Sequence, residues 1–436
     1  MIVRRLVGDY GVVPDAEGQP SLVRSVAIDI DDQGRIAAVG PEASLGVAPS
    51  EVERTGGLLM PGLVNTHAHT PMTLVRSAGD GLPLQEWLEH GVWPREFKMT
   101  ADDAYWGMVL GSAEMLLAGV TTSCEMYLHE ASVVRAVQAT GARLVMTPGV
   151  IAALAPDGKL DGRLEEITAF YRANHDPDQR VSVGFGPHSL YDLTPEQVRE
   201  ISDRAKELGA LMHIHLDETS AERDVVSTRD GQSATSVLAE IGALEGHVLG
   251  AHGVWLDDDD IATLGASGSG IAHCPMSNLK LGSGIARLTE LQAAGVQVGL
   301  GTDGPASNDN LDLWEEMKLA PLLARGVSGN ASSVDAATAI ALATVSGARA
   351  IGLHDVGEFR IGFRADVVRI DLDDPAFAPG LDQDLLPTLA FAGTGRHVTD
   401  VWVDGQRVVS DRVCVDVDLA EAMAQVKQRG ARLAGL

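Results

Sequence analysis

The chain has 436 residues, of which 45% are hydrophobic and 22% are charged, as in ordinary soluble globular proteins. Its formal net charge of −28 argues against nucleic acids and anionic membrane surfaces as partners, because like charges repel. Cys124, Cys274 and Cys414 are too few for a disulfide framework, and the sequence has no signal-peptide core and no apolar stretch near the roughly 20 residues that span a bilayer, so we expect a cytoplasmic protein.

The two ends of the chain have the same strand-and-turn pattern. Residues 1–57 contain short apolar runs with a hairpin pattern across residues 25–39. Residues 358–410 repeat this pattern, and Asp404-Gly405 within them is a strong hairpin turn. We expect residues 1–57 and 355–436 to form one small β-sandwich domain, completed by a C-terminal helix.

The middle of the chain, residues 58–354, alternates between β-rich apolar runs and helical patterns. The apolar runs are 63–66, 120–124, 143–147, 181–186, 211–215, 247–251, 270–273 and 296–301, and helical patterns cover 101–118, 194–208 and 233–241 among others. The repeat length is about 34 residues, the size of a βαβ step. This pattern predicts an α/β fold, a (β/α)8 TIM barrel.

Histidines and an aspartate follow several of these runs. In such barrels the working residues lie at the C-terminal ends of the strands, and residues two apart on a strand point to the same side. His67-Ala68-His69 is a weak signal by itself, but it gains weight from the others at the same strand ends. The full set is His67, His69, His215, His252 and Asp303.

This set predicts a site for one divalent metal ion, with His67, His69, His215 and Asp303 as ligands. Imidazole and carboxylate suit Zn²⁺ above all, with Fe²⁺ or Mn²⁺ as alternatives. Zinc lowers the pKa of bound water to about 7, and Asp303 is placed to take the water proton. His213 lies deeper on the same strand as His215, and we interpret it as a core histidine.

Further polar residues surround the expected mouth of the barrel. Glu218, three residues after His215, is suited to move a proton to and from a substrate nitrogen, the alternative being a solvated loop glutamate. His252 can hydrogen-bond the attacking oxygen, the alternative being a packed core imidazole. His188 also faces the mouth, and His273 is either a supporting or a structural residue.

Together these motifs resemble the amidohydrolase superfamily, and most of all its S-adenosylhomocysteine, methylthioadenosine and 5′-deoxyadenosine deaminases. The motifs that carry the resemblance are Pro-Gly-Leu-Val-Asn-Thr-His-Ala-His (61–69), Leu-Gln-Glu-Trp-Leu (84–88), Gly-Phe-Gly-Pro-His (184–188), His-Ile-His-Leu-Asp-Glu-Thr (213–219), Ser-Asn-Leu-Lys-Leu-Gly-Ser-Gly-Ile-Ala (277–286) and Gly-Thr-Asp-Gly-Pro-Ala-Ser-Asn (301–308). They run nearly from end to end of the chain. Guanine deaminases and chloro-s-triazine hydrolases share several of them.

The resemblance implies a barrel with a flanking β-sandwich, a single divalent metal, the four ligands above, and Glu218, His252 and Asp303 as catalytic residues. It also implies substrate contacts at Glu96, Arg163, His188, Glu218 and Trp87. Glu96 would hold ribose hydroxyls and Arg163 the distal end of the substrate. The alternatives are a surface helix residue for Glu96, a surface salt bridge for Arg163 and a core position for Trp87.

One position departs from the family pattern. Where the deaminase branch often has an arginine, this chain has Pro148, so a cation for a substrate carboxylate is missing there. This disfavours S-adenosylhomocysteine and leaves smaller or less charged 5′-substituents.

The sequence therefore predicts a metal-dependent aminohydrolase that converts an adenine nucleoside to its inosine-type product and ammonia. The alternatives are an amidohydrolase acting on a guanine, pterin or triazine ring, and a non-catalytic protein that has kept the fold. We expect a small-molecule substrate and, from the resemblance, a homo-oligomer.

Overall fold

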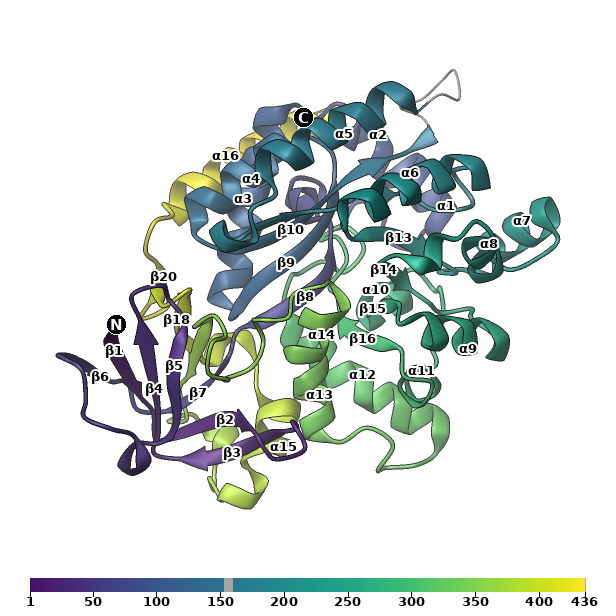
Figure 1. Ribbon diagram of the computed structural model, residues 1–436. Coiled ribbons are helices and arrows are strands. Elements are labelled where there is room, and N and C mark those ends of the chain that lie inside the picture. Colours follow the sequence, from purple (N-terminus) through teal and green to yellow (C-terminus); the bar gives the residue numbers. More distant parts are fainter. Residues whose placement is uncertain (153–159, 436) are drawn as a thin grey trace.

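The apolar runs in the middle of the chain form parallel strands in the computed structural model, which describes residues 1–152 and 160–435 (Figure 1). These strands are β8 (Leu63–Ala68), β9 (Val120–Tyr127), β10 (Arg143–Val150), β11 (Val181–Val183), β12 (Gly186–Pro187), β13 (Met212–Leu216), β14 (Val248–His252), β15 (Gly270–His273) and β16 (Gln297–Leu300). One sheet has the order β11-β10-β9-β8, with β12 also on β10, and another has the order β13-β14-β15-β16.

Isolated parallel bridges connect these two sheets on both sides. Phe185 pairs with Met212 and Ser189 with His215, while Ala68 pairs with Asp303 just beyond β16. The strands therefore follow one another around a ring in chain order, and the predicted (β/α)8 barrel is confirmed.

Helices lie between the barrel strands and around them. They are α1 (Leu84–Glu86), α2 (Trp93–Glu96), α3 (Ala101–Leu117), α4 (Glu130–Thr140), α5 (Asp161–Asn174), α6 (Pro195–Leu208), α7 (Ser220–Asp230), α8 (Ala234–Glu240), α9 (Asp258–Ser267), α10 (Pro275–Lys280), α11 (Leu288–Ala293), α12 (Leu313–Ser328), α13 (Ala336–Leu342) and α14 (Val345–Ala350). The predicted helices over 101–118, 194–208 and 233–241 are α3, α6 and α8. Thr100 and Thr194 start the first two with capping boxes, in which side chains pair with free backbone amides.

The predicted strand over residues 181–186 is divided in the structure. β11 ends at Val183 and β12 begins at Gly186. Gly184, between them, lies so close to the backbone of the segment before β13 that a Cβ atom there would be 2.5 Å from the carbonyl oxygen of Leu211. At this point the backbone changes partner: the N–H of Gly184 donates to the carbonyl oxygen of Met146 on β10, and the N–H of Phe185 donates to that of Leu211, before β13.

The chain ends form the predicted β-sandwich. A four-stranded sheet has the order β5-β4-β1-β6, and a seven-stranded sheet has the order β20-β19-β18-β17-β7-β2-β3. Their bounds are β1 (Ile2–Val7), β2 (Tyr10–Pro14), β3 (Pro20–Arg24), β4 (Val26–Asp31), β5 (Ile36–Pro41), β6 (Glu51–Arg54), β7 (Leu58–Pro61), β17 (Val367–Ile370), β18 (Val398–Val403), β19 (Gln406–Ser410) and β20 (Val413–Cys414). Leu6, Ile28, Val367 and Trp402, from both sheets, are buried in one apolar cluster.

The exact domain boundaries at 57/58 and 354/355 stay a prediction. β7 (58–61) pairs with β2 and β17 of the seven-stranded sheet.

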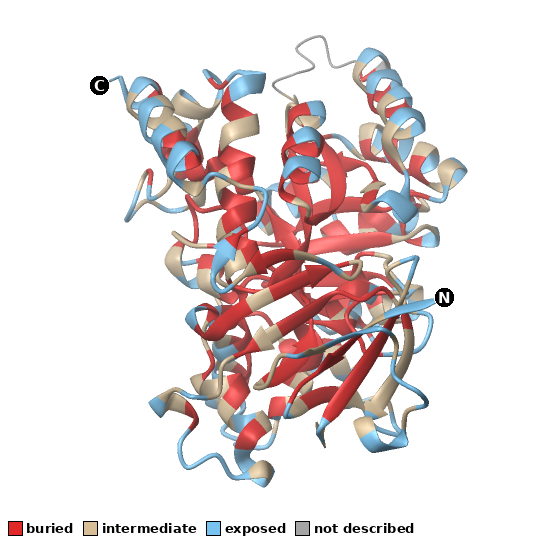
Figure 2. Ribbon diagram, turned by 90° about the vertical axis from the view of Figure 1, so that its left-hand side faces the viewer, coloured by how far each residue is buried: buried red, intermediate tan, exposed pale blue. Residues whose placement is uncertain are grey.

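The C-terminal helix α16 (Leu419–Ala434) packs along α3, and Arg432 pairs with Asp103 at 2.5 Å; α15 (Asp382–Ala392) contacts α13. Buried residues fill the barrel and the sandwich, and exposed residues cover the outer faces of the helices (Figure 2). No helix in the described ranges has the length and apolar character needed to cross a bilayer.

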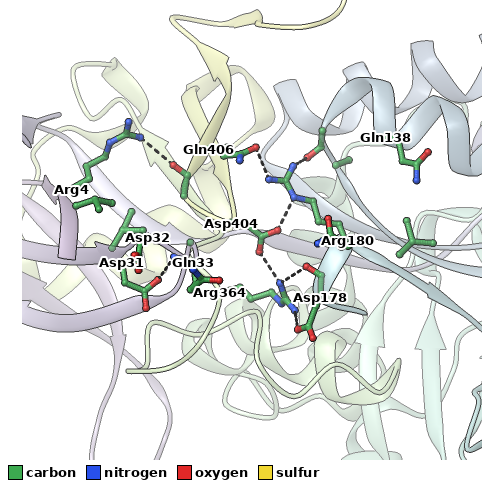
Figure 3. Close-up of a pocket in the computed structure, with 18 of the residues that line it drawn as sticks. Arg4, Asp31, Asp32, Gln33, Gln138, Asp178, Arg180, Arg364, Asp404 and Gln406 are labelled. Carbon is green, nitrogen blue, oxygen red and sulfur yellow. Dashed lines mark hydrogen bonds and ion pairs between the residues drawn. The ribbon is translucent and has the colours of Figure 1, made fainter. Parts of the chain in front are cut away.

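A charged cavity of about 600 Å³ lies between the sandwich and the N-terminal ends of β10 and β11 (Figure 3). Asp404, in the β18–β19 turn, accepts hydrogen bonds from Arg143 at 2.7 Å, Arg180 at 2.6 Å and Arg364 at 3.3 Å. These contacts attach the sandwich to the base of the barrel, at the end opposite the predicted site.

Candidate metal and substrate site

The two histidines of the His-Ala-His motif lie at the C-terminal end of β8. His67 is the penultimate residue of that strand and is fully buried, and His69 follows the strand. Asp303 lies just past β16, and its Oδ1 is 3.4 Å from the Nε2 atoms of both His67 and His69. His215, on β13, has its Nε2 3.3 Å from His69 Nε2. The structure thus brings together the four residues predicted as ligands.

This cluster has the composition and spacing of a metal site. Donor atoms of His67, His69 and Asp303 lie within 4.8 Å of one another, and so do those of His67, His215 and His252. Nε2 of His67 is buried and has no hydrogen-bond partner. Buried polar atoms are normally paired, so an unpaired ring nitrogen facing other donor atoms fits a bound divalent cation.

The other ring nitrogens of the three histidines all face hydrogen-bonding groups. Nδ1 of His69 lies 2.5 Å from the carbonyl oxygen of Met126, and Nδ1 of His215 lies 2.8 Å from that of His188. Nδ1 of His67 instead lies 2.9 Å from Nε2 of His213. Such partners orient metal-binding imidazoles.

Burial favours the form of these side chains that binds metals. It lowers the pKa of His67 to about 3 and the pKa of His215 well below its ordinary value. Both rings are therefore neutral near pH 7 and keep a free lone pair. Burial opposes ionisation of Asp303, but its contacts with His67 and His69 hold its pKa well below the ordinary range.

Two serines fix the orientation of the Asp303 carboxylate. The hydroxyl groups of Ser277 and Ser307 donate to Oδ2 at 2.6 Å and 2.8 Å, which leaves Oδ1 for the histidine side. Asp303 has a φ of 59° and His252 a φ of 76°, left-handed values that are uncommon for these residues. Backbone strain of this kind is concentrated at functional sites.

Glu218 and His252 lie next to this cluster. Glu218 follows β13 and is buried, and its Oε2 is 3.7 Å from Nε2 of His252 at the end of β14. Ser283 donates to Glu218 Oε1 at 3.2 Å, and Nδ1 of His252 pairs with Oδ1 of Asn278 at 2.9 Å. Burial, with a smaller contribution from the charge of Asp303, raises the pKa of Glu218. The raised pKa favours the protonated form of this carboxyl group.

A pocket opens above these groups, and its wall is mainly apolar. The apolar wall includes Met72, Leu84, Trp87, Leu88, Trp93, Phe97, Leu128, Ile151, Tyr191 and Leu281. His69, His215, Glu218, His252 and Asp303 form its polar floor. This combination suits a small, partly polar ligand.

Four of the five residues predicted to contact substrate line this pocket, and Glu218, on its floor, is one of them. Glu96, at the end of α2, is half-buried, and burial raises the pKa of its carboxyl group. The ring of His188 lies 4.8 Å from that of His215, centroid to centroid. Trp87 lines the pocket and is also a core residue, since it is buried and its Nε1 donates to the carbonyl of Ala78.

Arg163 is not brought into the lining of the described pocket. Its guanidinium donates to the two carboxylate oxygens of Glu130 at 2.8 Å and 3.3 Å, and to the carbonyl oxygen of Gly149 at 3.3 Å. It lies behind Gly149, which does line the pocket. Pro148 and the buried His273 are also absent from the lining that the structure describes.

Sequence reasoning missed the partners that hold the site residues in place. They are Ser277, Ser307, Asn278 and Ser283, which contact Asp303, His252 and Glu218. Ser277, Asn278 and Ser283 belong to the motif at 277–286, and Ser307 belongs to the motif at 301–308. Their place within those motifs, beyond strand ends, was the available signal.

Comparison with known proteins identifies the family. The model of the Amidohydrolase family matches residues 58–408. The 5-methylthioadenosine/S-adenosylhomocysteine deaminase of Symbiobacterium thermophilum is 37% identical over 436 residues, 99% of both chains, and that of Pelotomaculum thermopropionicum is 39% identical over 421 residues, 96% of both. The structure of an adenosine deaminase from Xanthomonas campestris with bound zinc is 31% identical, with a TM-score of 0.92 over 100% of this chain and 99% of that one. The chain therefore belongs to the amidohydrolase family.

Proposed function

We propose that this protein is a zinc-dependent hydrolase that deaminates an adenine nucleoside at C6, releasing ammonia and an inosine-type product. The observation that carries the proposal is the placement of a buried, raised-pKa carboxyl group, Glu218, beside the histidine–aspartate cluster on the floor of an apolar pocket. The relatives named as deaminases of adenine nucleosides, similar over nearly the whole chain, support it.

The residues that would hold the zinc ion are His67, His69, His215 and Asp303. A zinc ion there supplies a Lewis acid that makes a water molecule nucleophilic near neutral pH. Asp303 presents its Oδ1 to that position, because both serine hydroxyls bind its other oxygen. Asp303 is thus the base that takes a proton from the attacking water.

Glu218 acts on the purine ring. Its carboxyl group donates a proton to N1, which makes C6 more electrophilic, and its carboxylate then takes the proton of the new C6 hydroxyl and passes it to the amino group. The C6–N bond breaks with release of ammonia, and the proton held by Asp303 returns Glu218 to its starting form. His252 donates from Nδ1 to Asn278, so its Nε2 lone pair faces the site and accepts a hydrogen bond from the attacking oxygen.

The rest of the pocket binds the sugar and its 5′-substituent. Glu96 accepts hydrogen bonds from ribose hydroxyls, for which a carboxylate is well suited. The lining in the described residues contains no Lys or Arg, whereas Glu96 and Asp192 are acidic. We therefore propose adenosine, 5′-deoxyadenosine and methylthioadenosine as better substrates than S-adenosylhomocysteine, whose carboxylate would lack a partner.

Zinc-loaded protein incubated with these four nucleosides tests the proposal, with loss of the adenine ultraviolet absorbance and release of ammonia as readouts. Turnover of at least one uncharged nucleoside is expected. Turnover of guanine, a pterin or a chloro-s-triazine with none of the nucleosides would overturn it. The homo-oligomer and the cytoplasmic location stay predictions.

A further inference from the structure

His213 occupies an unusual position for a core histidine. It lies on β13, two residues before His215, and is fully buried. Its Nε2 is 2.9 Å from Nδ1 of His67, and its Nδ1 is 3.1 Å from Oγ1 of Thr147 on β10. Both ring nitrogens therefore have polar neighbours, and one of these neighbours, His67, belongs to the histidine–aspartate cluster.

The chain of contacts ends at a group that can only accept a hydrogen bond. Thr147 Oγ1 donates its single proton to the carbonyl oxygen of Glu125 at 2.9 Å. Thr147 then has only its lone pairs for His213, and the other neighbour of Nδ1, the Sγ of Cys124 at 3.6 Å, is more distant and only a weak hydrogen-bonding group. We therefore place the proton of the neutral His213 ring on Nδ1. Nε2 of His213 is consequently an acceptor, and it receives the proton on Nδ1 of His67.

This order of protons leaves Nε2 of His67 unprotonated. That atom is the one that faces Asp303 Oδ1 and lacks a hydrogen-bond partner. In His69 and His215 the Nε2 atom is also unprotonated, because in each ring Nδ1 donates its proton to a backbone carbonyl oxygen, that of Met126 and that of His188 respectively. At His67, Nε2 of His213 takes the place of such a carbonyl oxygen as the hydrogen-bond acceptor for Nδ1, and Thr147 holds His213 in the tautomer that this requires.

We infer that His213 is a positioning residue that, through Thr147 and the Glu125 carbonyl, holds His67 in the tautomer whose Nε2 can bind a metal ion. The inference rests on the proposed role of His67 as a ligand. It assigns a function to a side chain that composition and burial alone would class as core packing.

Two pairs of variants test this inference, with the zinc dissociation constant measured by chelator competition. His213→Gln can present an amide oxygen to His67, and His213→Phe keeps a ring without an acceptor. We expect Phe to raise the dissociation constant about 10- to 100-fold, the usual effect of removing such a partner, and Gln to raise it only a few-fold.

The pair at Thr147 separates the inference from a packing effect. Thr147→Val keeps the buried volume and loses the hydroxyl, whereas Thr147→Ser keeps the hydroxyl and loses a methyl group. We expect zinc affinity to fall about 10-fold in Val and by less than about 3-fold in Ser, while a packing role predicts that Ser, which leaves a cavity, is the more damaging change.

Thermal melting of each metal-free variant checks that it folds. Equal zinc affinity in Val and Ser, or wild-type affinity in His213→Phe, would overturn the inference. These measurements do not depend on any substrate, so a failure of nucleoside turnover leaves them interpretable. If the wild-type protein bound no zinc, that result would instead contradict the proposed function itself.

Discussion

Glu218 and His252 face one another across 3.7 Å, although Glu218 follows β13, His252 ends β14, and the helices α7 and α8 lie between them in the chain. Each has its own anchor, Ser283 for the carboxyl group and Asn278 for the imidazole. The positions of both side chains are therefore fixed by hydrogen bonds. In the proposed function, a purine ring bound beside them and the histidine cluster meets Glu218 as a proton donor and His252 as a hydrogen-bond acceptor.

Replacing Glu218 by Gln removes the proton donor and keeps the size of the side chain. We expect kcat for nucleoside deamination to fall about 10²- to 10⁴-fold, the range for loss of a general acid–base group. Zinc content, measured by elemental analysis, should stay at the wild-type level. Wild-type turnover by this variant would show that another group moves the proton.

Removing the metal with a chelator tests the ligand set through stability as well as activity. We expect activity to disappear, Tm to fall, and both to recover on adding zinc. A ligand present at 100 times its Kd stabilises the folded state by about 2.7 kcal/mol. Asp303→Asn should show the low Tm of the chelated wild type with or without zinc, and a normal zinc response in this variant would contradict the assignment.

Glu222 provides a prediction on pH and stability. Burial, together with the charges of Glu218 and Asp217, raises its pKa from 4.5 to about 8, and its Oε2 accepts the backbone N–H of Glu218 at 2.8 Å. The folded state keeps a proton that the unfolded chain releases, so this contribution to stability is complete below about pH 4.5 and is lost as the pH rises toward 8.

We therefore expect Tm of the wild type to fall more than Tm of Glu222→Gln between about pH 5 and 8. Glutamine keeps an acceptor for the amide of Glu218 and has no proton to lose. Glu200→Gln, at an exposed position of α6, is the matched control and should follow the wild type. Parallel curves for Glu222→Gln and wild type would show that Glu222 does not titrate in this range.

The described residues that line the pocket include no Lys or Arg, which predicts a preference among 5′-substituents. We expect kcat/KM for methylthioadenosine to exceed that for S-adenosylhomocysteine by about 10-fold or more, since an unpaired carboxylate is costly to desolvate. Ile151, just after β10, lines the pocket. Ile151→Lys should raise the relative rate with S-adenosylhomocysteine, whereas Ile151→Gln, similar in length without the charge, should not. Equal kcat/KM values in the wild type would refute the preference.

Asp404 predicts a stability effect at the other end of the barrel. Its carboxylate accepts hydrogen bonds from three arginines, and one of these, Arg143, is deeply buried. We expect Asp404→Asn to lower Tm while kcat and KM per folded molecule stay unchanged. Exposed Asp203→Asn serves as the control, with no change in Tm expected. A drop in kcat at full zinc content would show that the base of the barrel influences the site.

The strands and the ligand cluster could be predicted because both depend on local patterns. Apolar runs of four to six residues marked the strands, and His67 and His69, two residues apart at a strand end, were expected to point to one side. Arg163 could not be placed in this way. Its partner, Glu130, starts a different helix, and only the tertiary structure shows that the guanidinium is already paired behind Gly149.

The supporting contacts were unpredictable for the same reason. Thr147 contacts His213 from another strand, and Ser277 contacts Asp303 from the helix α10. Neither pair has a fixed sequence spacing. A serine or threonine in a buried segment gives no sign of which distant side chain it will meet.

The bridge between Ala68 and Asp303 closes the ring of strands at the same place where the histidines meet the aspartate. The segment that completes the ring of strands is therefore the same segment that brings the carboxylate of Asp303 to the histidines. In the proposed metal site, a chain that stops before residue 303 would have every histidine of the cluster but would lack its carboxylate ligand and the bridge to Ala68.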